Sequence, residues 1–365
     1  MTTRTEKTLL PLISVALGFL LGSVVVLLTG RSPVVMFSAM IKAVSGIDLT
    51  TGQTFNPRYI GEFIIQSMPI ILTGLAFAFA SRTGLFSIGA EGQVMMGSIA
   101  TMVIALTMNA PKIIHLPLVI LAAMLAAALW GAIPGLLKAK FNVHEVVVTI
   151  MLNYVAFHLN NYMVLSVFKS VDRYKTNFFP ETVMLKDQFL EGITNGSRLN
   201  WGFVPVIIAI LLFGFIINKT TFGYSLRAVG YNKEAARYAG MKVNRNIVVS
   251  MMIAGAFAGL AGVVISTGTF SFGRALPSME GYGMDGIAVA LVGANEAGGI
   301  LFAGLLFGML KAAQPLMQSQ GIPKEIVGII QASIVLFVAM QYGIKIILGR
   351  IRKKKEAVSA DGDRV

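Results

Sequence analysis

Polar side chains interrupt several long apolar stretches of this sequence. Glu91 lies in the segment Gly89-Ala-Glu-Gly-Gln93, and Asp285 lies in a glycine-rich apolar stretch close to Tyr282. Carboxylates, amides and imidazoles exchange hydrogen bonds with a polar solute, and an aromatic ring can lie against a flat one. A charged group at the centre of a membrane helix costs about 2.5–3.5 kcal/mol, so such residues mark functional sites. The candidate solute-contacting residues are Phe86, Glu91, Gln93, Asn153, Tyr154, His158, Tyr282 and Asp285.

Each of these polar residues also has a purely structural alternative. Glu91 and Glu296 can hold helix ends or pair with Arg82, and Asn160 and Asn161 can simply mark the end of a span. The sequence leaves both roles open. No lysine or arginine is evident in the middle of an apolar stretch, which favours an uncharged solute over a charged one.

The sequence offers no set of residues that is typical of catalysis. It contains no cysteine, and its three histidines, His115, His144 and His158, lack the spacing of a metal site. No Ser-His-Asp arrangement is evident, and the Gly-x4-Gly-Lys-Ser/Thr pattern of phosphate-binding loops is absent. We therefore predict a chain that is not an enzyme and that binds no cofactor or metal of its own.

The composition places these residues in a membrane protein. Of the 365 residues, 55% are hydrophobic and 13% are charged, and the mean hydropathy is +0.75. Soluble domains carry about 25% charged residues, so this composition excludes a soluble enzyme, a nucleic-acid-binding domain and a disordered chain. A spanning helix needs roughly 20 apolar residues, which allows about ten spans. The net charge of +13 then reflects basic cytoplasmic loops.

The apolar runs predict an all-α polytopic fold with about ten transmembrane helices, some of them short or broken. The first run, from Leu9 to Leu28, exceeds a signal-peptide core in length, so we expect an uncleaved span. An interfacial helix is expected at 34–44. The 281–294 run is short and rich in glycine, so we expect it to be broken or partly re-entrant. The other spans are predicted at 58–80, 85–108, 117–137, 146–168, 201–217, 247–268, 281–294, 297–317 and 325–348.

The basic residues predict the orientation of the chain. With the N-terminus in the cytoplasm, most of the 30 lysines and arginines fall in inner segments, including the cluster from Arg350 to Lys355. Both termini are then cytoplasmic. We predict a single transmembrane domain over 1–350, with a cytoplasmic loop at 218–246 and an extracytoplasmic loop at 169–200. A basic cytoplasmic tail follows at 351–365.

Three pairs of glycines repeat with helical spacing inside the predicted spans. They are Gly18 with Gly22, Gly255 with Gly259, and Gly304 with Gly308. Small residues four positions apart lie on one helix face and let two backbones approach closely. We predict that these pairs pack helices together; a subunit interface is the alternative.

The 218–246 loop carries the strongest local signal. Its helix-forming core runs from Asn232 to Tyr238, and we expect Gly230 and Gly240 to break the helix on either side. A short helix outside the membrane is typical of a docking element, and a solvated basic loop facing anionic lipid is the alternative. Glu234-Ala-Ala, followed three residues later by Gly240, resembles the start of the coupling motif of ABC importer permeases, without its later Ile-x-Leu-Pro part. This resemblance assigns ATPase coupling to Arg227, Gly230, Asn232, Glu234, Ala235, Ala236 and Gly240.

A longer resemblance covers residues 58–345. This part of the chain resembles the branched-chain amino acid/ribose/nucleoside permease family, and its front half is similar to the nucleoside branch. The segments that carry the resemblance are Arg227-Ala-Val-Gly-Tyr-Asn232, Ala254-Gly-Ala-Phe-Ala-Gly-Leu-Ala-Gly262, Gly281-Tyr-Gly-Met-Asp-Gly-Ile-Ala-Val-Ala290, Val292-Gly-Ala-Asn-Glu-Ala-Gly-Gly-Ile300, Arg82-Thr-Gly-Leu-Phe-Ser-Ile-Gly-Ala-Glu-Gly-Gln93 and Glu145-Val-Val-Val-Thr-Ile-Met-Leu-Asn-Tyr154.

The resemblance implies a multi-pass permease subunit of an ATP-driven nucleoside importer in a bacterial plasma membrane. It implies three kinds of protein partner: ABC ATPase subunits that bind ATP and Mg, a related second permease, and an external substrate-binding protein or lipoprotein that meets the 169–200 loop. Membrane lipid is a further partner, and no nucleic acid is expected. A permease for simple sugars or branched-chain amino acids is the alternative within the family. An ion-coupled secondary transporter, with Glu91 or Asp285 as the coupling acid, is the alternative from another class.

Overall fold

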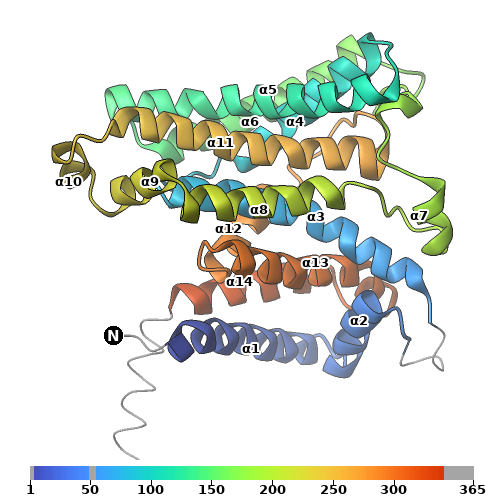
Figure 1. Ribbon diagram of the computed structural model, residues 1–365. Helices are drawn as coiled ribbons and strands as arrows, with labels where there is room; N and C mark the ends of the chain where they lie inside the picture. Colours follow the sequence, from blue (N-terminus) through green and yellow to red (C-terminus); the bar gives the residue numbers. More distant parts are fainter. Residues whose placement is uncertain (1–3, 49–54, 341–365) are drawn as a thin grey trace, which may run out of the picture. The chain divides into compact units, whose positions relative to one another are not determined.

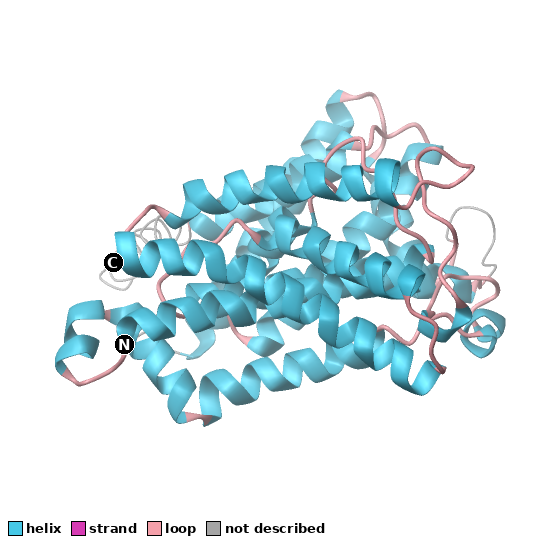
Figure 2. Cartoon of the chain, turned by 90° about the horizontal axis from the view of Figure 1, so that it is seen from above, coloured by secondary structure: helices cyan, strands magenta, loops and turns pink. Residues whose placement is uncertain are grey.

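The computed structural model describes residues 4–48 and 55–340, and within these ranges all regular elements are helical. Isolated antiparallel bridges, such as that between Lys175 and Arg274, are the β-type pairing found among the described residues. Figure 2 shows the helices and the loops that connect them. The predicted all-α polytopic fold is confirmed. The predicted basic tail at 351–365 lies outside the described residues.

The helices have the following bounds. They are α1 (Arg4–Leu28), α2 (Pro33–Ser45), α3 (Pro57–Ser81), α4 (Ala90–Thr107), α5 (Lys112–Phe141), α6 (Glu145–Tyr162), α7 (Gln188–Ile193), α8 (Phe203–Lys219), α9 (Thr221–Tyr231), α10 (Lys233–Tyr238), α11 (Val243–Val263), α12 (Tyr282–Val292), α13 (Ala297–Ser319) and α14 (Glu325–Ala339). Two π-helical turns, η1 (Met163–Val167) and η3 (Val264–Phe270), extend α6 and α11, and η2 (Glu181–Val183) is a short 3-10 helix.

Six of the described helices are long and apolar enough to cross a membrane, and the pair α8 and α9 makes a seventh if its 73° bend is one broken span. Three shorter apolar helices, α2, α12 and α14, accompany them. Short and broken helices are therefore present, as the apolar runs predict. The predicted span at 325–348 is described as helix up to Ala339.

The chain divides into two compact units. Among the described residues, the first comprises 4–36 with 317–340, and the second comprises 37–48 with 55–316. In the first unit α1 packs against α14, where Gly18 lies against Ile334 and Gly22 against Ile330. The Ser14 hydroxyl donates a hydrogen bond to the Phe337 carbonyl at 3.1 Å. The predicted close packing by this glycine pair is confirmed.

In the second unit, α11 packs along α5, as Figure 1 shows, and also contacts α3 and α4. Gly255 and Gly259 lie against Ala127 of α5, so no side chain separates the two backbones. Gly304 and Gly308 of α13 make room for the Ile71 and Ser67 side chains of α3. These two glycine pairs also pack helices, as predicted. Because van der Waals contact grows as backbones approach, such pairs hold helices together in lipid.

Two predicted spans begin or end differently in the structure. The span predicted at 85–108 becomes helical only at Ala90, because residues 83–89 form a largely buried loop that leads into α4. The 281–294 run is a continuous short helix, α12, and the irregular backbone precedes it at residues 271–281. The expected break therefore lies before this helix and not within it. Irregular backbone is tolerated at this position because amide side chains of α6 bond several of its backbone groups.

Candidate functional site

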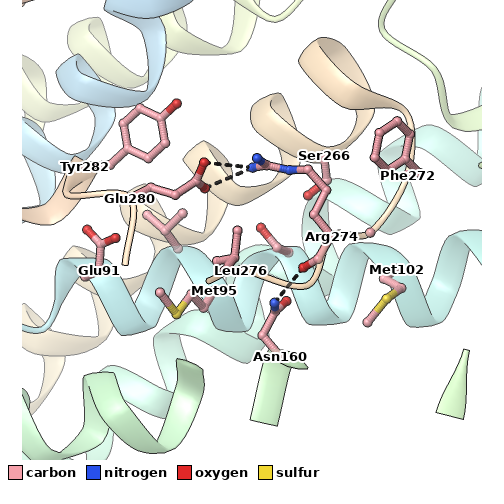
Figure 3. Close-up of a pocket in the computed structure, with 13 residues that line it drawn as sticks. Glu91, Met95, Met102, Asn160, Ser266, Phe272, Arg274, Leu276, Glu280 and Tyr282 are labelled. Carbon is pink, nitrogen blue, oxygen red and sulfur yellow. Dashed lines mark hydrogen bonds and ion pairs between the residues drawn. The ribbon is translucent and has the colours of Figure 1, made fainter. Parts of the chain in front are cut away.

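A cavity lies in the second unit among α4, α6, α12 and the irregular segment at 271–281 (Figure 3). Its space for water-sized occupants is about 30 Å³, and a single water needs about 10–15 Å³ of this kind of volume. The cavity therefore has room for a few waters but not for a solute of sugar size. Its lining residues are Glu91, Val94, Met95, Ser98, Met102, Asn160, Ser266, Phe272, Gly273, Arg274, Leu276, Glu280 and Tyr282.

The Glu91 carboxylate joins α4 to the start of α12. It accepts hydrogen bonds from the backbone N–H of Gly281 at 2.9 Å and of Gly283 at 2.6 Å. The residue is 6% exposed. A negative group at a helix N-terminus is stabilised by the helix dipole and by the unpaired N–H groups there. Glu91 thus satisfies the first turn of α12 while it also lines the cavity.

An ion pair within the irregular segment lines the same cavity. The Arg274 Nη2 lies 3.0 Å and 2.9 Å from the two carboxylate oxygens of Glu280, as the dashed lines of Figure 3 show. The guanidinium also lies over the Phe270 ring, 3.5 Å from its centroid. Both side chains of the pair keep about a quarter of their surface exposed. The pair is therefore partly hydrated rather than sealed in protein.

Two amides of α6 hold the backbone of the irregular segment. The Asn160 side chain donates to the Arg274 carbonyl at 2.9 Å. The Asn161 side chain donates to the Leu276 carbonyl at 2.9 Å and accepts from the Leu276 N–H at 2.8 Å. One amide therefore pairs with both backbone groups of a residue that lies in no helix. Buried backbone groups need such partners.

A second ion pair lies beside Tyr282. The Lys311 ammonium is 2.6 Å from the Asp285 carboxylate and 4.4 Å from the centroid of the Tyr282 ring. Lys311 belongs to α13 and lies well inside the predicted span at 297–317. The expectation that no lysine or arginine lies within a span is therefore wrong. Asp285 neutralises this lysine, which lowers the cost of placing it there.

The 218–246 loop forms two short helices, α9 and α10. The Asn232 side chain accepts from the N–H groups of Glu234 and Ala235, both at 3.0 Å, and so caps α10. Gly240, with φ +79°, ends it. The helical core predicted over Asn232 to Tyr238 is confirmed, and so is the break at Gly240.

The role expected for Gly230 is wrong. This residue lies inside α9, and Asn232 makes the break instead. A Cβ at Gly230 would collide with the Arg82 carbonyl and lie 3.1 Å from the Gly84 nitrogen. Gly230 is therefore a contact between α9 and the loop that leads into α4.

The exposed surface of α10 is polar and aromatic. Glu234 pairs with Arg237 at 3.0 Å, and Ala235 is exposed while Ala236 is buried. Tyr238, on the same helix, is 92% exposed. In α9, the Arg227 Nε is buried and has no hydrogen-bond partner within the described part of the chain.

Comparison with known proteins decides the family. Residues 59–339 match the model of the branched-chain amino acid transport system permease component. The chain belongs to this permease family. The match agrees closely with the extent of the resemblance seen in the sequence. The long apolar helices and the family together make the chain a multi-pass membrane protein and a transport subunit.

Several relatives of this permease resemble it over most of their length. The guanosine ABC transporter permease protein NupP of Bacillus subtilis is 44% identical over 97% of the chain and 99% of NupP. The nucleoside ABC transporter permease protein NupB of Lactococcus lactis is 36% identical over the whole of both chains. The glucose ABC transporter permease protein TsgB13 of Haloferax volcanii is 31% identical over 90% of the chain and 86% of TsgB13. Bacillus subtilis also has a second guanosine permease protein, NupQ, which is 27% identical over 68% of the chain and 79% of NupQ.

The permease brings only some of its candidate solute-contacting residues together. Glu91 and Tyr282 line the cavity. Asp285 pairs with Lys311, and the ammonium of that lysine lies over the Tyr282 ring. Asn153 accepts from the Gly92 N–H at 2.9 Å and donates to the Ile88 carbonyl at 2.9 Å, so it holds the loop before α4.

Four further candidates of the permease do not line the cavity. Gln93 is buried and lies close to Gly131 of α5. Phe86 and Tyr154 are about half exposed, and His158 is also exposed and lies against the neighbouring Phe157 ring. The side chains that do line the cavity, beyond those predicted, include Arg274 and Glu280. Sequence reasoning omitted this pair because it falls in a predicted loop, and the opposite charges six residues apart are the one signal that could have found it.

Proposed function

We propose that the chain is the transmembrane permease subunit of an ATP-driven importer that carries nucleosides across a bacterial plasma membrane. The similarity to the guanosine permease NupP over almost the whole of both chains carries this proposal. NupB, which is named for nucleosides, supports it. The family of transport-system permease components, with relatives named as ABC permeases, favours this proposal over an ion-coupled secondary transporter.

The chemistry of the cavity suits a nucleoside, which is an uncharged solute with ribose hydroxyls and a flat base. Asn160, Ser98 and Ser266 offer neutral hydrogen-bonding groups, and Arg274 with Glu280 adds donors and acceptors whose charges cancel. The rings of Phe272 and Tyr282 offer flat apolar surface for a base. Because the cavity is small in this conformation, the protein must open it to admit a nucleoside.

The partners and orientation form part of the same proposal. Two ABC ATPase subunits bind ATP and Mg in the cytoplasm and dock on α10, within the cytoplasmic loop at 218–246. A related permease completes the channel, and the pair NupP and NupQ in one organism supports a heteromeric arrangement. Both termini are cytoplasmic, so the 169–200 loop faces an external binding protein or lipoprotein. Residues 1–350 then act as one permease domain, with 351–365 as its cytoplasmic tail.

The contacts of α9 suggest how ATP hydrolysis reaches the cavity. Movement of α10 shifts α9, because Asn232 ends one helix and caps the other. Gly230 of α9 bears on the backbone of residues 82–84, which precede α4. Glu91, in the first turn of α4, carries the displacement to α12 through its two hydrogen bonds. The coupling residues and the cavity residues are thus linked by direct contacts.

A sugar permease is the second candidate, favoured by the 31% identity to the glucose permease TsgB13. A branched-chain amino acid permease is a weaker one, although Lys311 and Asp285 provide one charge of each sign beside Tyr282. Both charges already neutralise each other, so a zwitterion would have to separate them.

Uptake of radiolabelled solutes tests the proposal. Cells with and without this chain are given guanosine, adenosine, ribose, glucose or leucine, and a second strain lacks the ATPase subunit. Loss of guanosine and adenosine uptake in both strains is the expected result. Loss of ribose, glucose or leucine uptake instead would overturn the nucleoside assignment. Uptake that needs this chain but not the ATPase would overturn the ATP-driven mechanism.

A further inference from the structure

The irregular segment at residues 271–281, here called the strap, covers one side of the cavity. It contributes Phe272, Arg274 and Glu280 to the lining, together with Gly273 and Leu276. Its two ends have left-handed backbone, with φ +68° at Ser271 and +82° at Gly281. Chain direction changes sharply at such residues. Between these two bends, residues 272–280 make no helical hydrogen bonds.

The first half of the strap pairs with the 169–200 loop through backbone hydrogen bonds. The Thr176 N–H donates to the Gly273 carbonyl, and the Ala275 N–H donates to the Tyr174 carbonyl, both at 2.9 Å. The Phe179 N–H donates to the Ser271 carbonyl, also at 2.9 Å. Lys175 and Arg274 form an antiparallel bridge at the centre of this pairing. Any displacement of residues 174–179 is therefore passed directly to the strap.

The second half of the strap is anchored at Leu276 by the Asn161 amide and at Gly281 by the Glu91 carboxylate. The Arg274 side chain reaches forward to Glu280, so the ion pair spans the part of the strap that lines the cavity. A partly exposed ion pair gains little over its hydrated, separated state, so it can open and reform easily. A different ion pair, Arg198 with Glu62, joins the 169–200 loop to α3 and does not line the cavity.

We propose that the strap is the outer gate of the solute cavity and that Arg274 with Glu280 is its latch. Docking of the external binding protein on the 169–200 loop pulls the strap through its paired backbone, the ion pair separates, and the solute enters. The freed guanidinium and carboxylate then offer hydrogen bonds to the hydroxyls of the entering solute. This inference rests on the proposed importer function and orientation.

A reversible crosslink tests the gate. The chain has no cysteine, so the double variant Arg274→Cys/Glu280→Cys provides the only reactive thiols on this subunit. The full complex with its ATPase, second permease and binding protein is treated in membrane vesicles with a short bifunctional reagent that a reductant cleaves. Crosslinking is expected to lower guanosine uptake at least tenfold, and reduction to restore it.

The control is the double variant Lys42→Cys/Asp48→Cys. These residues form an ion pair with the same six-residue separation, away from the cavity lining and the strap, so a crosslink there leaves the strap free and uptake within twofold. Unchanged uptake after complete crosslinking of positions 274 and 280, verified by mass spectrometry, would overturn the gate.

A second variant tests the link to the loop and keeps the proposal decidable if the double variant does not assemble. Leu276→Cys places one thiol on the cavity wall, and its labelling by a membrane-impermeant reagent is followed with and without saturating binding protein. At least threefold faster labelling with binding protein is expected, and an unchanged rate would refute transmission from the loop. This labelling needs no transported solute. If the wild-type complex takes up glucose but not guanosine, the substrate proposal fails alone, and the crosslink test is repeated with glucose.

Discussion

Replacing Gly230 by alanine has two opposed effects on the stability of the folded protein. Inside an exposed helix, glycine is less favourable than alanine by about 0.5–1 kcal/mol, so Gly230→Ala on α9 alone would stabilise the protein. The added methyl group, however, would collide with the Arg82 carbonyl and lie 3.1 Å from the Gly84 nitrogen. Both are backbone atoms that cannot rotate away. Such overpacking costs about 1–3 kcal/mol, so we expect a net loss of stability of about 0–2.5 kcal/mol.

The assay compares Gly230→Ala with Gly328→Ala in purified complexes. Gly328 lies in α14, is exposed, and has no heavy atom within 4 Å of the position of an added Cβ. Thermal stability is measured by the monodisperse fraction that survives heating, and ATPase activity is measured with and without binding protein. We expect Gly328→Ala to be neutral or stabilising. Gly230→Ala should lower both the melting temperature and the stimulation of the ATPase. Equal melting temperatures and equal stimulation in the two variants would refute the contact.

Three further predictions follow from the described contacts. Asn232→Ala removes the cap of α10, which costs about 1 kcal/mol, and should weaken ATPase stimulation while Asn232→Asp retains it. Lys311→Met leaves Asp285 unpaired and should lower the melting temperature more than Lys311→Met/Asp285→Asn does; an equal loss in a thermal melt would contradict the pairing. Hydrogen bonds from the Trp201 side chain and the Phe189 N–H lower the pKa of Asp187. These hydrogen bonds therefore stabilise the folded protein fully above the unfolded pKa of about 3.9, and their contribution is lost as the pH falls through the lower folded pKa. Tryptophan fluorescence should report this loss at low pH, and Asp187→Asn should abolish the pH dependence.

Local sequence patterns predicted the elements of this protein well. Apolar runs located the helices, and the glycine pairs located three helix contacts, because small residues at helical spacing have one physical use in lipid. The capping role of Asn232 and the break at Gly240 follow from side-chain and backbone geometry within a few residues. These features depend on residues that are close together in the chain, so a single sequence is enough to predict them.

The cavity depends on neighbours in space, which the sequence does not specify. Glu91 was a reasonable candidate, but its partners are N–H groups about 190 residues further along the chain. The sequence predicts Gly230 to be a helix breaker, whereas the structure shows that it is a contact with the Arg82 carbonyl. Arg274 and Glu280 fall in a segment that the sequence predicts to be an ordinary loop. They line the cavity because this segment folds back against α4 and α6.

The amide of Asn161 has a consequence for how this protein can vary in evolution. Asn161 fixes Leu276 through both of its backbone groups, and Glu91 fixes Gly281. Only Pro277 to Glu280 lie between these two anchors. An inserted or deleted residue there would break one anchor and leave the backbone groups of Leu276 or Gly281 without their partners, whereas residues 186–198 have no such double attachment to the strap. Related permeases should therefore keep a constant length between positions 276 and 281, and differ in length in the loop instead.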